Sequence, residues 1–257
     1  AVIQFQTLTA ADVKQLRALT SRSQRHKQQL FLAEGDHLTG EAIQEGIVKS
    51  LLLMEGKQNK FSHYLSLGLS VYLLPDRTFL QIADTKTPQG VIALCGLPNL
   101  SSINNLGKRV VALNAVQDPG NVGTILRSLE AAGFTGLLLD SICADPFSPK
   151  ALRASMGSAL RIPVCQVDAL ETALQSMEGY VTIAAVLNGE PFYQRDKSID
   201  KICLLIGSEG GGLSNNLMQM ATLKLKLPLH GRAESLNAAV AASVMMYDFV
   251  RVWEERA

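Results

Sequence analysis

The chain has 257 residues, a length typical of two domains of roughly 100 to 150 residues each. Hydrophobic residues make up 47% and charged residues 18%, so each domain can bury a core, and no apolar run reaches the roughly 20 residues of a membrane span. The net charge of +1 argues against general, charge-driven binding of nucleic acid but allows a local basic patch, and the absence of a leader-like start predicts a cytosolic, cytoplasmic protein.

The first part of the chain predicts a small α/β module. Thr9 and Asp12 form a helix start, and Val13, Leu16 and Leu19 follow at helical spacing. Short apolar runs, typical of strands, then alternate with helical segments. The predicted strands are residues 31–33, 49–54, 71–74 and 90–94, and the predicted helices are residues 36–45, 57–67 and 76–83. This alternation indicates an α/β sandwich.

Residues 96–108 are rich in turn formers and poor in charge, as expected of an interdomain linker. We therefore predict a first domain over residues 1–97, a linker over 98–107 and a second domain over 108–257. In the second domain the predicted strands are residues 109–113, 136–139, 181–185, 202–206 and 224–227. Their alternation with helical segments predicts a mostly parallel sheet with helices on both faces.

A long helix is predicted at the end of the sequence, over residues 235–254, with Ser235 as a good N-cap. Five apolar residues recur along it at helical spacing: Leu236, Val240, Val244, Tyr247 and Val250. One face of this helix is therefore predicted to be apolar.

Three motifs each follow a predicted strand, so a parallel sheet brings them to one edge, where ligands bind. The first runs from Asn114 to Arg127, with Asp118 and Pro119 as cap and first helical turn. An ordinary capped helix would explain this motif alone. As a functional reading, the planar guanidinium of Arg127 matches the paired oxygens of a phosphate.

The second motif, residues 204–213, is an apolar strand that runs into a glycine-rich turn before a short helix near Ser214. Glycines such as Gly207 and Gly210 let the backbone approach a ligand closely. The acidic Glu209 and the missing Walker lysine argue against a triphosphate loop. Glu209 is suited to accept hydrogen bonds from a ribose or to pair with Arg127, although a plain turn with a solvated glutamate explains the motif equally well.

The third motif joins the last predicted strand to the last helix. Leu227, Leu229 and Leu236 are suited to form apolar walls for an adenine, with loop backbone groups reading its edge. Asn237, expected in the first helical turn, is placed to point into the same space. Capping by Ser235 alone would also account for the motif.

Together these stretches resemble the three signature motifs of the TrmH/SpoU family in the SPOUT superfamily. They read Asp-Pro-Gly-Asn-Val-Gly…Arg, Ile-Gly-Ser-Glu-Gly…Gly-Leu and Leu-Pro…Glu-Ser-Leu-Asn, in the family's order and spacing. The segment Arg153-Ala-Ser-Met-Gly-Ser is similar to the family's intermediate segment, so the match extends from Arg109 to Arg251. The first domain, at Phe31-Leu-Ala-Glu-Gly-Asp-His-Leu, resembles the substrate-binding domain of ribosomal RNA members.

This resemblance implies an S-adenosylmethionine-dependent RNA ribose 2′-O-methyltransferase with a SPOUT-type parallel sheet and a C-terminal trefoil knot. It implies catalytic and substrate-binding roles for Asn121, Arg127, Glu209 and Asn237. The implied cofactor contacts are Gly207, Leu227 and Leu236, with Glu209, Gly210, Leu229 and Ser235 nearby. The sequence departs from the family at Ala238 and Ala239, where Val-Ser is usual.

The partners expected are structured RNA, most consistent with ribosomal RNA, and a second copy of the chain. The apolar face of the last helix and the family's habit both suggest a homodimer whose site borrows residues from both subunits. For RNA contact we favour a basic run with little opposing charge, namely Lys14, Arg17, Arg22, Arg25, His26 and Lys27. A solvated helix face is the more usual explanation of such a run.

Several alternatives stay open. Transfer RNA is the alternative substrate, and a catalytically silent RNA-binding protein on the same fold is the alternative function. A Rossmann-type enzyme is disfavoured, because its glycine fingerprint does not follow the first strand. The isolated cysteines Cys95, Cys143, Cys165 and Cys203 predict buried reduced thiols, and no metal site is expected.

Overall fold

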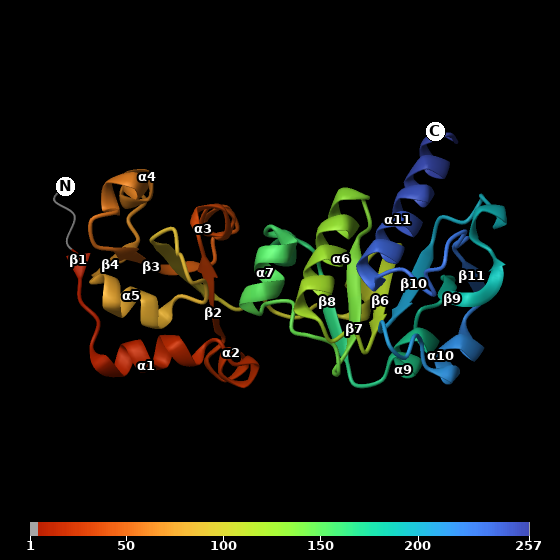
Figure 1. Cartoon of the computed structure of the whole chain (residues 1–257), viewed down its shortest axis with the longest axis horizontal. Coiled ribbons are helices and arrows are strands. Elements are labelled where there is room, and N and C mark those ends of the chain that lie inside the picture. The colour runs from red at the N-terminus through yellow and green to blue at the C-terminus, as the bar shows by residue number, and fades with distance from the viewer. Residues whose placement is uncertain (1–4, 257) are drawn as a thin grey trace. The chain divides into compact units, whose positions relative to one another are not determined.

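The computed structural model describes residues 5–256, which form two compact units (Figure 1). The first unit comprises the chain up to Asn99 together with Phe147–Leu160, and the second comprises Leu100–Pro146 and the chain from Arg161. The predicted linker falls where the first unit gives way to the second, and the predicted domain limits stay a prediction. No helix among the described residues is long and apolar enough to cross a membrane.

The first unit is built on a five-stranded mixed sheet in the order β1-β4-β3-β5-β2. Its strands are β1 (Phe5–Gln6), β2 (Leu30–Glu34), β3 (Val48–Met54), β4 (Ser70–Leu74) and β5 (Val91–Gly96). β1 and β3 run parallel to β4, whereas β5 runs antiparallel to β2 and β3. The four strands predicted here are confirmed to within two residues, and β1 was not predicted, because two residues are too short to show alternation.

Helices lie on this sheet. They are α1 (Ala10–Ala18), α2 (Arg22–Gln28), α3 (Asp36–Gln44), the 3-10 turn η1 (Gln58–Phe61), α4 (Ser62–Leu65), α5 (Asp76–Ile82) and α7 (Pro149–Ser155). Those predicted after Thr9 and over residues 36–45, 57–67 and 76–83 are confirmed, whereas the helices over residues 22–28 and 149–155 were not predicted. Thr9 caps α1 in a capping box, in which its side chain accepts from Asp12 N and the Asp12 carboxylate accepts from Thr9 N. Leu16 of α1 and the C-cap residue Leu19 pack with Phe79 and Ile82 of α5 in one core.

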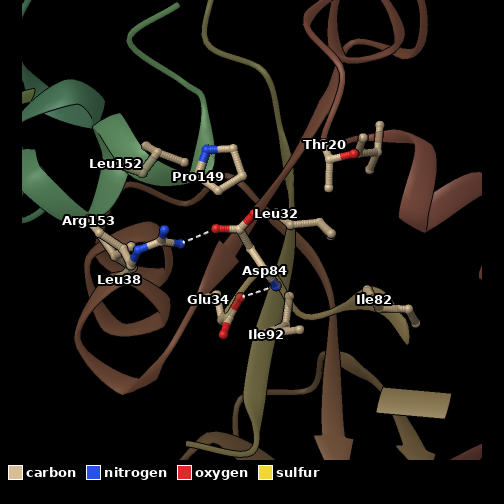
Figure 2. A pocket seen from close by; sticks show the side chains of 11 residues that line it. Thr20, Leu32, Glu34, Leu38, Ile82, Asp84, Ile92, Pro149, Leu152 and Arg153 are labelled. Carbon is tan, nitrogen blue, oxygen red and sulfur yellow. Dashed lines mark hydrogen bonds and ion pairs between the residues drawn. The ribbon is translucent and has the colours of Figure 1, made fainter. Parts of the chain in front are cut away.

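α7 belongs to the first unit although its sequence lies between two strands of the second. The ring of Phe147 packs 6.0 Å from that of Phe31 on β2, and both residues are buried. A small pocket between α7 and this sheet is crossed by an ion pair from Arg153 to Asp84 (2.7 Å), and Glu34 accepts from the Asp84 amide (Figure 2). The protein's own polar groups therefore occupy this pocket, and no residue of the three motifs lines it.

The second unit is built on a six-stranded sheet in the order β11-β9-β10-β6-β7-β8. Its strands are β6 (Arg109–Asn114), β7 (Gly136–Asp140), β8 (Val164–Val167), β9 (Val181–Pro191), β10 (Ile202–Gly207) and β11 (Leu223–Lys226). Every paired neighbour runs parallel, which confirms the predicted sheet. β8 was not predicted, because its four residues fall within the segment assigned by resemblance.

The remaining elements are η2 (Ile103–Asn105), α6 (Pro119–Ala131), α8 (Ser158–Arg161), α9 (Leu170–Gln175), η3 (Phe192–Gln194), α10 (Asn215–Met220) and α11 (Ala238–Glu254). α9 and α10 cover a core that includes Val110, Leu205 and Leu217. α6 and α11 pack against each other (Figure 1), and Ser243 Oγ of α11 donates to Ser128 Oγ of α6 (2.7 Å).

The predicted start of the last helix is wrong. α11 begins at Ala238, and its N-cap is Asn237, whose Oδ1 accepts from Ala239 N (2.9 Å) and Val240 N (3.2 Å). Ser235 lies in the exposed loop before the helix. The cap therefore lies two residues further along the third motif than predicted, and asparagine is as good a cap as serine.

The apolar face predicted on this helix is not the face that packs into the core. Val240, Val244 and Tyr247 are exposed, whereas Met246 and Phe249 are buried. Both faces are apolar, so the sequence pattern alone does not distinguish the one that covers the sheet.

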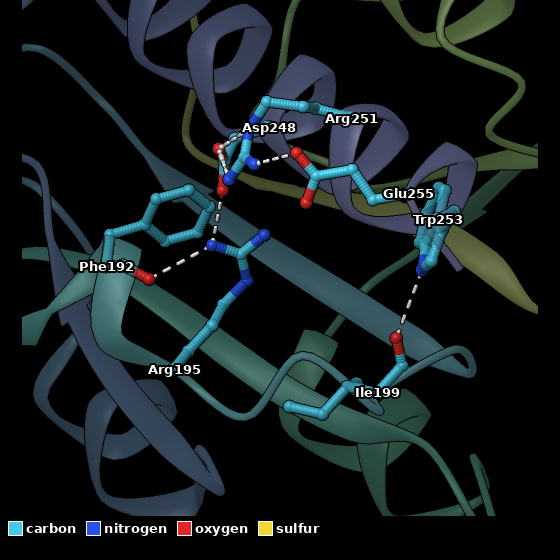
Figure 3. Close-up of polar contacts among 7 residues, drawn as sticks. All are labelled: Phe192, Arg195, Ile199, Asp248, Arg251, Trp253 and Glu255. Atoms are coloured by element: carbon cyan, nitrogen blue, oxygen red, sulfur yellow. Dashed lines mark hydrogen bonds and ion pairs between the residues drawn. The ribbon is translucent and has the colours of Figure 1, made fainter.

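A buried ion pair between Arg195 and Asp248 links α11 to the segment after β9 (Figure 3). Arg195 Nη1 donates to Asp248 Oδ2 (2.6 Å) and to Phe192 O (3.0 Å). Its guanidinium carbon lies 4.0 Å from the ring centroids of both Phe192 and Phe249. Arg251 also donates to the Asp248 carboxylate (2.8 Å). Because the Arg195 side chain is almost fully buried, its charge depends on this carboxylate.

We expect Asp248→Ala to lower the free energy of unfolding by about 3 kcal/mol, because it leaves the Arg195 charge buried without its carboxylate. The matched control is Glu255→Ala, which removes an exposed pair with Arg251 and should cost less than about 1 kcal/mol. Urea denaturation followed by the fluorescence of Trp253, the single tryptophan, measures both. An equal decrease in the free energy of unfolding in the two variants would show that the buried pair contributes no more to stability than the exposed pair.

Candidate active site

The loops after β6, β10 and β11 carry the three motifs. Because all six strands run parallel, their carboxyl ends share one edge of the sheet. β10 lies directly beside β6, with Gly207 in register with Asn114. The start of the first motif and the start of the second motif's loop are therefore neighbours.

The first motif forms the beginning of α6 as predicted. Asp118 is the N-cap and accepts from Gly120 N (3.3 Å), and Pro119 occupies the first helical turn. Asn121 follows in the same turn and is half-buried. Arg127 lies six residues further along and is exposed.

The second motif is a tight turn closed on itself. Ser208 and Gly212 exchange backbone hydrogen bonds (3.2 and 2.9 Å), and Ser208 Oγ accepts from Gly211 N (3.2 Å). A Cβ atom at Gly207 would collide with the backbone of Gly212 and Leu213, so only glycine fits there. Gly210 has open space around it. The turn thus leaves Glu209 and Gly210 exposed at its tip.

Asn121 joins the three motifs. Its Nδ2 donates to Glu209 Oε1, and its Oδ1 accepts from Asn237 Nδ2 (3.1 Å). One residue from each motif is therefore linked in a chain of two hydrogen bonds. This is the convergence that the sequence predicted, reached through a contact that it did not predict.

The predicted pairing of Arg127 with Glu209 is wrong. Glu209 is bonded to Asn121, and Arg127 makes no hydrogen bond or ion pair with any other residue that the structure describes. Six residues along a helix of 3.6 residues per turn place Arg127 on a different face from Asn121. Arg127 is therefore exposed and has no partner among the described residues.

The third motif forms an irregular loop between β11 and α11. Leu227 is half-buried, whereas Leu229 and Leu236 are each 38% exposed, and Ser235 is exposed. Exposed leucines on a loop with accessible backbone groups are chemically suited to an adenosine, whose flat faces are apolar and whose edge is polar. The residues present therefore fit the implied cofactor, and their individual contacts with it stay a prediction.

Two residues of this edge have roles that the sequence did not predict, namely Asp140 and the first residue of the first motif, Asn114. The buried Asp140, at the end of β7, accepts from Asn114 Nδ2 (2.8 Å), Ala115 N (2.9 Å) and Cys143 N (3.0 Å). Asn114 Oδ1 in turn accepts from Ser214 N (2.9 Å). Together they hold the loops after β6, β7 and β10 to one another. A carboxylate directly after a buried apolar strand is the signal by which Asp140 could have been found.

The four cysteines are buried, as predicted. Burial raises the pKa of the Cys95, Cys143 and Cys203 thiols to about 12, and it also raises the pKa of Cys165. Among the described residues no group of histidine, cysteine or acidic side chains is arranged to hold a metal ion.

Arg25 must be removed from the predicted RNA contacts. It is only 2% exposed, and its Nη1 donates to the carbonyl oxygens of Leu19 and Thr20 (both 2.8 Å) after the end of α1. A long cationic side chain is here a helix cap rather than a surface charge. Arg17 and Lys27 are exposed and Arg22 is half-buried, so these three keep their predicted role as a proposal.

Comparison with known proteins assigns both parts of the chain. Residues 108–247 match the SpoU rRNA Methylase family, and residues 10–93 match the MRM3-like substrate binding domain. The 23S rRNA (guanosine(2553)-2′-O)-methyltransferase RlmP of Bacillus subtilis is 36% identical, over 95% of this chain and 98% of that protein.

Two solved structures resemble this protein over nearly its whole length. The AdoMet-bound rRNA methyltransferase of Sinorhizobium meliloti superposes with a TM-score of 0.83 at 30% identity, covering 96% of this chain and 98% of that one. The SpoU methyltransferase AviRb of Streptomyces viridochromogenes, in complex with AdoMet, gives 0.85 at 27% identity, covering 95% and 98%.

Proposed function

The chain belongs to the SpoU rRNA methylase family, and we propose that it transfers the methyl group of S-adenosylmethionine to a ribose 2′-hydroxyl of ribosomal RNA. The observation that carries this proposal is the chain of hydrogen bonds from Glu209 through Asn121 to Asn237, which unites one residue of each motif. The substrate-binding domain matched by residues 10–93 favours ribosomal RNA over transfer RNA.

The proposed reaction is in-line displacement, in which much of the acceleration comes from alignment of the two reactants. S-adenosylmethionine, when bound, supplies an electrophilic methyl group. Leu227, Leu229 and Leu236, with Gly207, Gly210 and Ser235, are the residues proposed to hold it. The apolar character of the exposed leucines supports this assignment.

Arg127 is proposed to clamp a phosphate of the RNA and to orient the hydroxyl. Its exposed guanidinium has no protein partner among the described residues, and its planar donors match phosphate oxygens in pairs. Arginine stays protonated, so it serves as a donor and not as a base. Glu209, whose second carboxylate oxygen makes no hydrogen bond with a described residue, is proposed to accept one from the ribose.

The function is tested by mapping ribose methylation in ribosomal RNA from a strain that lacks the gene. We expect one 2′-O-methyl group to disappear and to return when the purified protein and S-adenosylmethionine are added to that RNA. Calorimetry should show cofactor binding by the purified protein. Binding of the cofactor or RNA without any change in methylation would favour the catalytically silent alternative.

We expect Arg127→Lys to lower kcat for methyl transfer about a hundredfold, because lysine keeps the charge but loses the planar pair of donors. The cofactor dissociation constant, measured by calorimetry, should stay within about twofold, since Arg127 lies outside the proposed cofactor loops. Near-normal turnover of Arg127→Lys would rule out the clamp. The control is Arg77→Lys, the same exchange on an exposed arginine of α5 that lies outside the three motifs.

A homodimer built on α11 is proposed as the working form. The exposed apolar residues Val240, Val244 and Tyr247 lie on one face of α11, the arrangement expected of a helix that packs against another chain. Light scattering should give twice the chain mass, and Val244→Asp should give a monomer by placing a charge in the interface. A monomeric unmodified protein at working concentration would contradict this proposal.

The trefoil knot implied by the family is proposed for the end of the chain. Its support is indirect: β10 lies between β6 and β9, and the chain returns after β11 so that Asn237 reaches Asn121. Ordinary connection rules disfavour such threading, so the family resemblance is its main basis.

A further inference from the structure

The loop after β7 carries one large apolar side chain outward. Ile142 is 59% exposed, whereas Cys143, Asp145 and Phe147 in the same loop are buried. A single exposed isoleucine on a protein surface is ordinary. Its significance here depends on how rigidly it is held and on what lies beside it.

The backbone around Ile142 is fixed by hydrogen bonds. Asp140 Oδ1 accepts from Ile142 N (3.1 Å) and from Cys143 N (3.0 Å). Two residues later, Ala144 N donates to Val116 O (2.9 Å), and Val116 N donates to Cys143 Sγ (3.3 Å). The loop is therefore preorganised, and a ligand that covers Ile142 would not have to order it.

These contacts place Ile142 beside the first motif. Val116, to which the loop is bonded, lies two residues before the N-cap Asp118, and Asn121 follows in the first turn of α6. Gln117, between Val116 and the cap, is exposed, and its amide makes no hydrogen bond with another described residue. The exposed Ile142 and the unpaired amide of Gln117 thus each adjoin a residue of the contact between Val116 and Cys143. This contact lies at the edge of the sheet that carries the catalytic candidates.

We propose that Ile142 and Gln117 bind a nucleobase in the RNA segment that carries the methylated ribose. A base has a flat apolar face, which an aliphatic side chain can cover, and a polar edge with donors and acceptors, which a carboxamide can meet from both its ends. This assignment rests on the proposed function and makes both residues determinants of substrate selection.

The test compares Ile142→Ser and Gln117→Ala with the unmodified protein, using large ribosomal RNA from the deletion strain. Each variant should raise the RNA dissociation constant and KM about five- to tenfold, while the cofactor dissociation constant and the melting temperature stay unchanged. Ile142→Leu should restore RNA affinity. The matched control is Leu100→Ser: Leu100 is 44% exposed and lies beside Ser101, which is bonded to the first residue of β8 at the opposite edge of the sheet.

Unchanged RNA affinity and KM in Ile142→Ser would overturn the inference, and so would an equal loss in Leu100→Ser. A shift of Ile142→Ser from dimer to monomer in light scattering would assign the residue to a protein interface and would also overturn it. RNA binding is measured separately from turnover. Absence of methyl transfer by the unmodified protein would therefore count against the proposed function, whereas the binding comparison would still decide this inference.

Discussion

The two hydrogen bonds of the Asn121 amide hold the candidate site together. The parallel sheet delivers three loops to one edge, but parallel strands alone do not fix the distances between those loops. A carboxamide carries a donor and an acceptor on one planar group, so Asn121 can give a hydrogen bond to Glu209 and take one from Asn237. Aspartate there would lose the donor and repel Glu209. The side chain at this position is therefore constrained by chemistry as well as by size.

Much of the fold could be predicted because its signals are local. Apolar runs marked the buried strands, and Asp118, Pro119 and Ser214 marked helix starts that the structure has. The failures concern partners distant in sequence. Arg127 and Glu209 have opposite charges, which suggested a pair, but helical phase turns Arg127 outward and an amide already occupies the carboxylate. Asp140 was missed because its partners lie on other loops.

Charge and hydrophobicity were also poor guides to burial in two places. Arg25 belongs to a basic run, yet it is buried because two carbonyl oxygens after α1 need donors. α11 has apolar residues on two faces, so its periodicity predicts a helix but not which side meets the sheet. In both cases, burial of the side chain depends on which other parts of the chain pack against the helix. Periodicity in a single sequence does not predict these tertiary contacts.

The first unit is assembled from two separate segments of the chain, and this affects how the protein folds during synthesis. Its β2 core is closed by Phe147, and α7 lies on it, although both are encoded about fifty residues after the unit's own strands end. On the ribosome, the amino-terminal strands can pair as soon as they emerge, but Phe31 must wait for a later part of the chain before it is covered. Folding of the two units is therefore coupled in time, and a fragment that stops at the linker would leave this apolar surface open to chaperones or to aggregation.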